Sequence, residues 1–279
     1  MTTLSVAAPA KLNLFLHVTG QRADAYHTLE SLFVLIDLAD TIDIADRDDG
    51  TILRSAAMPG VSERDDLTLR AAYALRQAVA GTRGASIRVT KRIPAGAGLG
   101  GGSSDAASIL LALNRLWSLG LSREALTRIG VRLGADVPFF LGGGAALARG
   151  IGDDLTPMSI PSFWVALAMP RVHVSTASIF ASAELTRSVP SAKMDVFSEG
   201  YGHNDLESAA VARFPQVREA VQALRQASPL ARMTGSGACV FAPFVAESDA
   251  RKALDLLPGG TPRCVVRMLA RHPLASFAS

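Results

Sequence analysis

The stretch Pro94-Ala95-Gly96-Ala97-Gly98-Leu99-Gly100-Gly101-Gly102-Ser103-Ser104-Asp105-Ala106-Ala107 indicates the fold more strongly than any other part of the chain. Glycine lacks a Cβ atom and tolerates positive φ angles, so a glycine-rich turn lets backbone N–H groups approach a phosphate closely. Apolar residues recur at helical spacing from residue 103 to residue 117, and Ser103 or Ser104 stands where a helix N-cap is expected. The pattern predicts a phosphate-binding loop at the positive end of a helix dipole.

Two other kinds of phosphate loop fit this stretch less well. No lysine followed by Ser or Thr comes after the glycines, so the P-loop pattern is absent. Gly96, Gly98 and Gly101 satisfy the dinucleotide pattern G-x-G-x-x-G, which leaves a nicotinamide-dependent oxidoreductase open as an alternative. Against it, residues 86–91 alternate apolar and polar side chains, whereas a dinucleotide-binding turn follows an almost wholly apolar parallel strand. The acidic residue expected about 20 positions later is also missing.

The composition predicts a folded protein with a weakly basic surface. The chain has 279 residues, 49% of them hydrophobic, which suffices for one large domain or two lobes. The net charge is +3 and the arginines are scattered, so we expect no nucleic-acid partner, although an RNA-binding module stays open as a different class. Cys239 and Cys264 have no metal-site spacing and suit free thiols in a reducing compartment. No basic leader or membrane-length apolar run occurs, so we expect a cytoplasmic protein without membrane contact.

Strands and helices alternate along most of the chain. Residues 11–18 alternate as a strand that places Lys11 and Asn13 on one face. A helix over residues 122–133 is expected to end at Gly134, and Val137-Pro138 predicts extended backbone, so that Asp136 lies on a short stiff corner. The other expected strands are 32–36, 41–44, 87–90, 164–169, 238–241 and 265–269, and the other expected helices are 67–79, 217–226, 246–257 and one from about residue 175.

Two further segments look irregular. Residues 156–161 contain two prolines in a turn-rich stretch, which predicts a boundary between lobes of residues 1–158 and 159–279. Residues 188–202 have no hydrophobic period and are expected to form a surface loop.

Several separated motifs resemble one superfamily of small-molecule kinases, named for galactokinase, homoserine kinase, mevalonate kinase and phosphomevalonate kinase. They are Ala8-Pro9-Ala10-Lys11-Leu12-Asn13-Leu14, the glycine loop, and Thr234-Gly235-Ser236-Gly237-Ala238-Cys239-Val240-Phe241. Within this superfamily, three further motifs resemble those of the 4-diphosphocytidyl-2-C-methylerythritol kinases. They are Gly20-Gln21-Arg22-Ala23-Asp24-Ala25-Tyr26-His27, Gly134-Ala135-Asp136-Val137-Pro138-Phe139-Phe140 and Asn204-Asp205-Leu206-Glu207. The resemblance covers nearly the whole chain in the expected order. Ala25 departs from it, because the family usually has glycine there.

The resemblance implies a two-lobed α/β kinase fold with mixed sheets backed by helices and a left-handed βαβ crossover. It implies that ATP with Mg²⁺ binds in the glycine loop. It also implies phosphorylation of the 2-hydroxyl of 4-diphosphocytidyl-2-C-methylerythritol in the non-mevalonate isoprenoid pathway. The partner is then a small molecule, and the chain is expected to be a monomer or a weak homodimer. A kinase for a smaller alcohol, such as homoserine or mevalonate, is the rival within the superfamily.

The resemblance also implies roles for individual residues. Asp136 would accept the hydroxyl proton and Lys11 would lie beside it, near the transferred phosphoryl group. Tyr26 and Phe180 would sandwich the cytosine, which His27 would read. The implied ATP-binding residues are Pro94, Ala95, Gly96, Ala97, Gly98, Leu99, Gly100, Gly101, Gly102, Ser103 and Ser104, and the implied substrate-binding residues are Asn13, Tyr26, His27, Asp136, Thr176, Phe180, Gly235, Ser236 and Gly237.

Some of these roles have plainer alternatives. Ser104 is expected by analogy to help hold Mg²⁺, beside the carboxylate of Asp105, but the set of metal ligands stays open. From the residues alone, Asp136 also suits a turn, Phe180 suits core packing and His27 suits a cap or the core.

Overall fold

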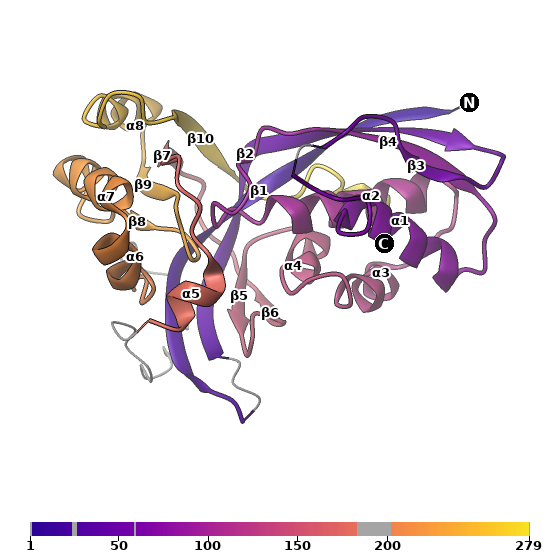
Figure 1. Cartoon of the computed structure of the whole chain (residues 1–279), viewed down its shortest axis with the longest axis horizontal. Helices are drawn as coiled ribbons and strands as arrows, with labels where there is room; N and C mark the ends of the chain where they lie inside the picture. Colours follow the sequence, from indigo (N-terminus) through magenta and orange to yellow (C-terminus); the bar gives the residue numbers. More distant parts are fainter. Residues whose placement is uncertain (1, 24–26, 59, 183–201, 279) are drawn as a thin grey trace.

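A long antiparallel hairpin runs through the middle of the molecule. The computed structural model describes residues 2–23, 27–58, 60–182 and 202–278. Strands β1 (Thr3–Gln21) and β2 (His27–Arg47) pair along almost their whole length, and one lobe lies on each side of them (Figure 1). Both strands are buried through most of their length, because each lobe covers part of the hairpin. Side chains on this hairpin can therefore face either lobe.

In the part of the first lobe that the structure describes, a mixed sheet is combined with four helices. Strand β4 pairs with β2 in antiparallel orientation, and β3 pairs with β4 in parallel orientation with α1 between them in sequence, which makes a βαβ unit. Strands β5 and β6 form a hairpin whose first strand pairs with the other end of β2. The elements are β3 (Ile52–Arg54), α1 (Leu67–Ala78), β4 (Gly84–Thr90), α2 (Gly101–Leu116), α3 (Arg123–Gly130), α4 (Val137–Gly142), β5 (Ala146–Arg149) and β6 (Asp154–Pro157).

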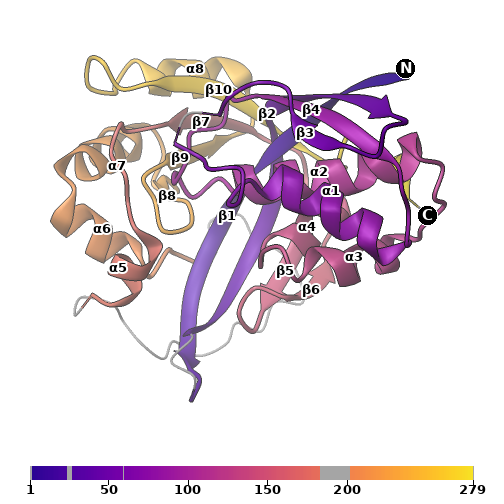
Figure 2. The same ribbon diagram turned by 45° about the vertical axis from the view of Figure 1, so that its right-hand side comes forward.

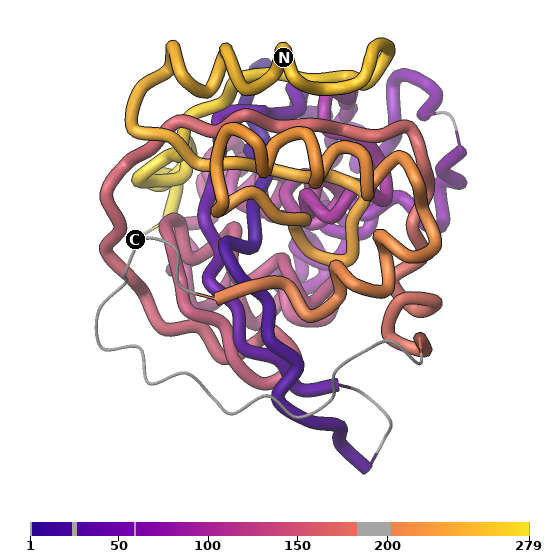
Figure 3. Tube along the Cα trace, turned by 90° about the vertical axis from the view of Figure 1, so that its left-hand side faces the viewer, coloured from indigo at the N-terminus to yellow at the C-terminus, as the bar shows by residue number. Residues whose placement is uncertain are grey.

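The second lobe is an antiparallel sheet covered by helices, which stand together at one end of the molecule (Figures 2 and 3). The strand order is β10-β7-β9-β8, and Met268 and Leu269 of β10 pair with Ile36 and Leu35 of β2. Across the described residues, this pairing joins both lobes into a ten-stranded mixed sheet. The elements are β7 (Trp164–Ala168), α5 (Thr176–Phe180), α6 (Glu207–Arg213), α7 (Pro215–Ala227), β8 (Arg232–Met233), β9 (Val240–Phe244), α8 (Glu247–Leu254) and β10 (Arg263–Leu269). The 3₁₀ turn η1 (Ala275–Phe277), which follows β10, lies against the first lobe.

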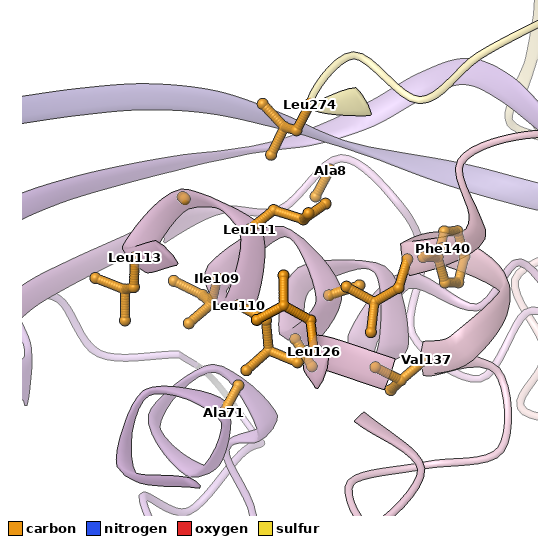
Figure 4. Packing of buried hydrophobic residues seen from close by; sticks show 14 of the residues in the cluster. Ala8, Ala71, Ile109, Leu110, Leu111, Leu113, Leu126, Val137, Phe140 and Leu274 are labelled. Atoms are coloured by element: carbon orange, nitrogen blue, oxygen red, sulfur yellow. The ribbon is translucent and has the colours of Figure 1, made fainter. Parts of the chain in front are cut away.

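Helix α2 lies at the centre of the first lobe's hydrophobic core (Figure 4). Ile109, Leu110 and Leu113 are fully buried and belong to one cluster with Ala71 of α1 and Leu126 of α3. The end of the chain returns to this lobe, since Leu274 and Phe277 pack against the same cluster. The start of α2, which carries the glycine loop, is thus anchored by a helix that is buried over most of its length.

The main sequence predictions are confirmed. The α/β class with mixed sheets backed by helices is present, and the expected helix over residues 67–79 corresponds to α1. Residues 32–36 and 41–44 belong to one continuous strand, β2, rather than to two. The expected surface loop lies almost wholly in residues 183–201, outside the described residues. No helix among the described parts of the chain combines the length and apolarity needed to cross a membrane.

The predicted N-cap of α2 is wrong. The helix begins at Gly101, and the cap is Gly100 in the left-handed region, with φ of 69° and no side-chain cap bond. Ser103 and Ser104 therefore lie inside the first turn. Glycine occupies the cap because the loop needs a positive φ there, which serine adopts only with strain.

The predicted backbone around Pro138 is also wrong. Helix α3 ends at Gly130, before Gly134, and Val137 and Pro138 form the first turn of α4 instead of an extended segment. Proline is tolerated in the first turn of a helix, because the N–H groups there have no intrahelical partner. Asp136 therefore precedes a helix. Likewise, residues 156 and 157 lie in β6 and are not a turn.

Replacing Leu110 by alanine should destabilise the protein by about 2–5 kcal/mol, because it leaves a cavity in the core around α2. Leu110 has no exposed surface. Leu256, 45% exposed beyond α8, offers a control, and Leu256→Ala should change the stability by no more than about 0.5 kcal/mol. Chemical denaturation measures both variants. Equal losses would contradict the central role of α2.

Candidate active site

The glycine loop forms one wall of a cavity of about 410 Å³. Gly96, Gly98 and Gly100 have positive φ angles of 64°, 75° and 69°. A Cβ atom on Gly98 would lie 2.3 Å from the carbonyl oxygen of Thr234, so only glycine fits at this position. Ser104 N is the first amide of α2 to bond within the helix, to Gly100 O at 2.9 Å, which leaves the preceding amides of the first turn without helical acceptors. These amides are therefore available to a ligand in the cavity, which Gly101, Gly102 and Ser103 line.

The segment from Met58 to Thr68 also lines this cavity. It contributes the apolar side chains of Met58, Val61 and Leu67, together with Asp65, Asp66 and Thr68. Apolar surface in the same cavity as a glycine loop is typical of a nucleotide site, where the base packs on the apolar surface and the phosphates bind the N–H groups of the loop. We call this space the nucleotide cavity.

A second cavity, of about 280 Å³, shares Gly96, Gly98 and Gly100 with the nucleotide cavity. We call it the substrate cavity. It receives side chains from both lobes and from the hairpin between them. Its lining residues are Lys11, Asn13, Leu16, Leu29, Phe33, Gly96, Gly98, Gly100, Asp136, Ile151, Gly152, Thr176, Phe180, Leu206, Gly235 and Ser236.

Lys11 and Asp136 meet in the substrate cavity. Lys11 Nζ lies 3.9 Å from Asp136 Oδ2 and donates a hydrogen bond to Asn13 Oδ1 at 2.5 Å. The ammonium group also lies 5.0 Å from the centre of the Phe33 ring, in cation–π contact. Burial lowers the pKa of Lys11, and the neighbouring carboxylate of Asp136 acts in the opposite direction. The pair brings a buried cation and a carboxylate to one point of the cavity wall.

The carboxylate of Asp136 is not used to build its own turn. Asp136 precedes α4, but its side chain accepts no capping hydrogen bond from that helix. Its side chain is 31% exposed, against 6% for Lys11, so it can meet a ligand in the cavity. The alternative of a turn-forming aspartate therefore lacks the hydrogen bond that would support it.

Asn13 is held rigidly from two sides. Its side-chain amide donates to Ser31 Oγ at 2.7 Å, and its backbone N–H donates to Thr234 Oγ1 at 2.8 Å. Ser31 in turn donates to Phe15 O at 2.5 Å. Sequence reasoning did not identify Ser31, because a lone serine in a strand carries no signal of its contacts.

The residues expected at the cytidine end come together around α5. The rings of His27 and Phe180 stack, with centroids 5.0 Å apart. Thr176 Oγ1 and Ser236 Oγ share a hydrogen bond of 2.8 Å, which joins α5 to the second glycine turn. Tyr26 lies outside the described residues, and Gly237 packs beside Met233 without lining the substrate cavity. Ile151 and Gly152, between β5 and β6, line it without having been predicted.

The glycine-loop residues from Pro94 to Ser103 all line the nucleotide cavity, but Ser104 does not. Ser104 is fully buried, and its hydroxyl donates to Pro9 O at 2.6 Å. Because α2 starts at Gly101, Ser104 is turned towards β1. The structure thus uses Ser104 to attach the helix to the hairpin.

Asp105 lines the nucleotide cavity next to a lysine. Lys91 Nζ donates to Asp105 Oδ2 at 2.7 Å and also to Asp40. Burial raises the pKa of Asp105, and the charge of Lys91 opposes this shift. Asp105 Oδ1 is buried and accepts no hydrogen bond from the described residues.

Comparison with known proteins agrees with this geometry. Two family models match, the GHMP kinases N terminal domain over residues 66–144 and the GHMP kinases C terminal over residues 191–258. A 4-diphosphocytidyl-2-C-methyl-D-erythritol kinase of Thiobacillus denitrificans is 54% identical to this chain, over 97% of each protein. The chain belongs to the 4-diphosphocytidyl-2-C-methyl-D-erythritol kinase family of the GHMP kinases. The relative of the same name from Cupriavidus necator is 52% identical, over 97% of this chain and 94% of the relative.

Solved structures show the same fold. A crystal structure of 4-(cytidine 5'-diphospho)-2C-methyl-D-erythritol kinase matches with a TM-score of 0.83 and 32% identity, over 95% of this chain and 99% of that one. Homoserine kinase from Cytophaga hutchinsonii matches with a TM-score of 0.71 and 17% identity, over 98% of this chain and 96% of that one, which supports the fold alone. Membership of this kinase family overturns the RNA-binding and oxidoreductase alternatives.

Lys11 should titrate below the ordinary lysine pKa of 10.5, because burial disfavours its charged form. Since Asp136 raises this pKa, Asp136→Asn should lower it further. ¹³C NMR of the lysine ε-carbons measures both values, with the Lys11 signal assigned by its loss in Lys11→Met. A pKa at or above 10.5 in the parent, or no decrease in Asp136→Asn, would contradict the buried ion pair.

Proposed function

We propose that this chain transfers the γ-phosphoryl group of ATP to the 2-hydroxyl of 4-diphosphocytidyl-2-C-methyl-D-erythritol, a step of isoprenoid precursor biosynthesis. The observation that carries the proposal is the shared wall of Gly96, Gly98 and Gly100 between the two cavities. A triphosphate on one side of this wall and an alcohol on the other would meet where Lys11 and Asp136 lie. The names of the similar proteins supply the choice of alcohol.

The nucleotide cavity fits ATP on three counts. Glycine permits the positive φ angles of this loop and its close packing, since a Cβ atom on Gly96, Gly98 or Gly100 would collide with a neighbouring part of the protein. The first-turn amides of α2, which have no helical acceptor, would donate to the phosphates. Met58, Val61 and Leu67 offer an apolar surface for the base. The helix dipole adds favourable electrostatics for the triphosphate.

A Mg²⁺ ion would accompany the triphosphate, and nucleotide-bound Mg²⁺ needs only one or two protein ligands. Asp105 and Ser103 line the nucleotide cavity, and the unpartnered, buried Oδ1 of Asp105 suits such an ion. These are the two residues that would hold the ion in this proposal. When bound, the ion neutralises phosphate charge.

Asp136 would accept the proton of the attacking hydroxyl. The hydroxyl oxygen forms a bond to the γ-phosphorus, the bond between that phosphorus and the oxygen bridging to the β-phosphate breaks, and ADP leaves with the electron pair. The proton passes to the carboxylate of Asp136. Lys11 keeps its proton, and its charge stabilises both the carboxylate and the transferring phosphoryl group. Asn13 holds Lys11 Nζ in place through its Oδ1.

The cytidine end of the substrate would bind around α5. Phe180 offers a stacking surface on the cavity wall, with His27 against it. Thr176, Gly235 and Ser236 close the same wall, and Tyr26, whose position lies outside the described residues, would cover the other face of the base.

The two lobes divide this work in our proposal. Residues 1–158 supply the nucleotide cavity and the Lys11–Asp136 pair, and residues 159–279 supply most of the cytidine-facing wall. The substrate is a small molecule, and we propose that the chain acts as a monomer or a weak homodimer.

ADP release should be fastest with the cytidine diphosphate-linked alcohol when it is compared with homoserine, mevalonate and methylerythritol phosphate. In Asp136→Asn, turnover should fall by roughly a hundredfold or more, because the general base is lost while the shape is kept. The ATP KM should change little. Asp255→Asn, at the exposed end of α8, is the matched control and should have parent activity. Faster reaction with a smaller alcohol would refute the substrate, and near-parent turnover of Asp136→Asn would refute the base.

Phe180→Ala should raise the KM for the cytidine-linked alcohol by roughly ten- to a hundredfold, since stacking contributes about 1–3 kcal/mol per base. Phe214→Ala is a suitable control, because Phe214 packs partly buried against the same core cluster without lining the substrate cavity. Both variants should lose similar stability, but only Phe180→Ala should weaken competition by free cytidine nucleotides. Equal competition in parent and Phe180→Ala would argue against base stacking on this ring.

A further inference from the structure

The motif Asn204-Asp205-Leu206-Glu207 has a structural task next to the substrate cavity that the roles above do not include. Only Leu206 of this motif lines the cavity. Asn204 is 5% exposed and forms a single bridge with Leu16 of β1. Around it, Leu16 N donates to His203 O at 2.9 Å and Asp205 N donates to Leu16 O at 2.9 Å, so the motif is attached to the hairpin.

The side-chain amide of Asn204 is fully engaged. Its Nδ2 donates to Met233 O and to Gly235 O, both at 2.8 Å, and its Oδ1 accepts a hydrogen bond from Leu206 N at 2.9 Å. Two donors directed at two carbonyl groups require an amide nitrogen. A carboxylate at the same place would face both carbonyl oxygens with negative charge, and alanine would leave both carbonyls unpaired in a buried place.

The carbonyls that Asn204 holds belong to the second glycine turn. Gly235 has a φ of 56°, lines the substrate cavity and lies against the glycine loop, since a Cβ on it would be 3.1 Å from Gly98 O. Glu207 binds the backbone just before this turn, because its carboxylate accepts a hydrogen bond from Met233 N at 2.8 Å. On the far side, Thr234 Oγ1 accepts the bond from Asn13 N. The turn is therefore fixed between β1 and the motif.

The amides of Gly235 and Ser236 face no acceptor among the described residues. A left-handed glycine followed by free N–H groups is a geometry that binds anionic oxygens. The Ser236 N–H belongs to the same planar peptide as Gly235 O, so the bond from Asn204 to this carbonyl fixes its direction. The Gly235 N–H lies one peptide earlier, between the two carbonyl groups, of Met233 and Gly235, that Asn204 binds.

We infer that Asn204 is a positioning residue for the transfer, which orients the Gly235-Ser236 turn so that its amides meet the anionic substrate. This rests on the proposed function for the identity of the anion, a phosphate oxygen of the cytidine diphosphate-linked alcohol. Asn204 itself does not contact substrate, and it acts through the Gly235 peptide.

Asn114 offers a matched control. It is 4% exposed, its Nδ2 donates to Leu121 O and Phe277 O at 3.0 Å each, and its Oδ1 accepts a hydrogen bond from Leu121 N at 2.9 Å. It makes the same bonds as Asn204 at a place that lines neither cavity. Asn204→Ala and Asn114→Ala should therefore lose similar stability.

Steady-state kinetics distinguishes the two variants. In Asn204→Ala, kcat/KM for the cytidine diphosphate-linked alcohol should fall by roughly ten- to a hundredfold, because a small displacement of a binding group is costly for the reaction. The ATP KM should stay within about twofold of the parent. Asn114→Ala should retain both parameters. An equal fall in both variants, parent kinetics in Asn204→Ala, or a matching rise in the ATP KM would overturn the inference.

Hydrogen exchange tests the same contact without substrate. In Asn204→Ala, the amides of Thr234, Gly237 and Cys239, which are hydrogen-bonded in the folded protein, should exchange about tenfold faster or more, and in Asn114→Ala they should not. If the parent lacks activity on the cytidine-linked alcohol, the proposed function fails, and unchanged exchange would still refute the positioning role. Should Asn204→Ala not fold, Asn204→Ser keeps one donor and should show a smaller change of the same kind.

Discussion

Direct backbone contact between the two glycine turns sets the geometry of the catalytic site. Gly98 lies so close to Thr234 O that a Cβ atom would be 2.3 Å away, and Cys239 N donates to Ala97 O at 3.3 Å. The glycine loop before α2 belongs to the first lobe, and the second glycine turn, between β8 and β9, belongs to the second lobe. Because nothing separates them, the nucleotide and substrate cavities have a common wall, and a phosphoryl group needs to move only a short way between them.

Strand β1 of the central hairpin holds both glycine turns in place through hydrogen bonds from its backbone N–H groups. Lys11 N donates to Leu99 O at 3.0 Å, and Asn13 N donates to Thr234 Oγ1 at 2.8 Å, so adjacent parts of one strand bind both turns. The same strand carries the buried ammonium group of Lys11. A buried charge is costly unless it is paired and hydrogen-bonded, and Asp136 and Asn13 provide both interactions. The result is an electrostatic site organised before substrate binds.

Predictions from the sequence were correct where interactions between residues close together in the chain determine the backbone conformation. The helix over residues 67–79 and the glycine loop leading into α2 follow from periodicity and from the steric freedom of glycine. The same rules failed at Gly100, where a left-handed cap replaced the expected serine, and at Pro138, which begins a helix instead of an extended segment. At Gly100, packing against Lys11 and Phe140 leaves no room for a side chain, since a Cβ atom there would lie about 3 Å from each of them. Ser31 and Asn204 were not identified as supports of the site, because their partners lie far away in the chain.

By itself, the sequence determined the class of fold, the phosphate-binding loop and, through six separated motifs, the kinase family and the residue types of its site. These properties depend on the order of residues along the chain, where side-chain period and glycine placement act over a few positions. Only the tertiary structure decided that Asn13 binds Lys11 Nζ, that Ser104 binds Pro9 O instead of lining the nucleotide cavity, and that Asn204 holds the second glycine turn. The last two contacts join segments that lie far apart in the sequence, and they form because burial of the hydrophobic clusters brings those segments together around the hairpin.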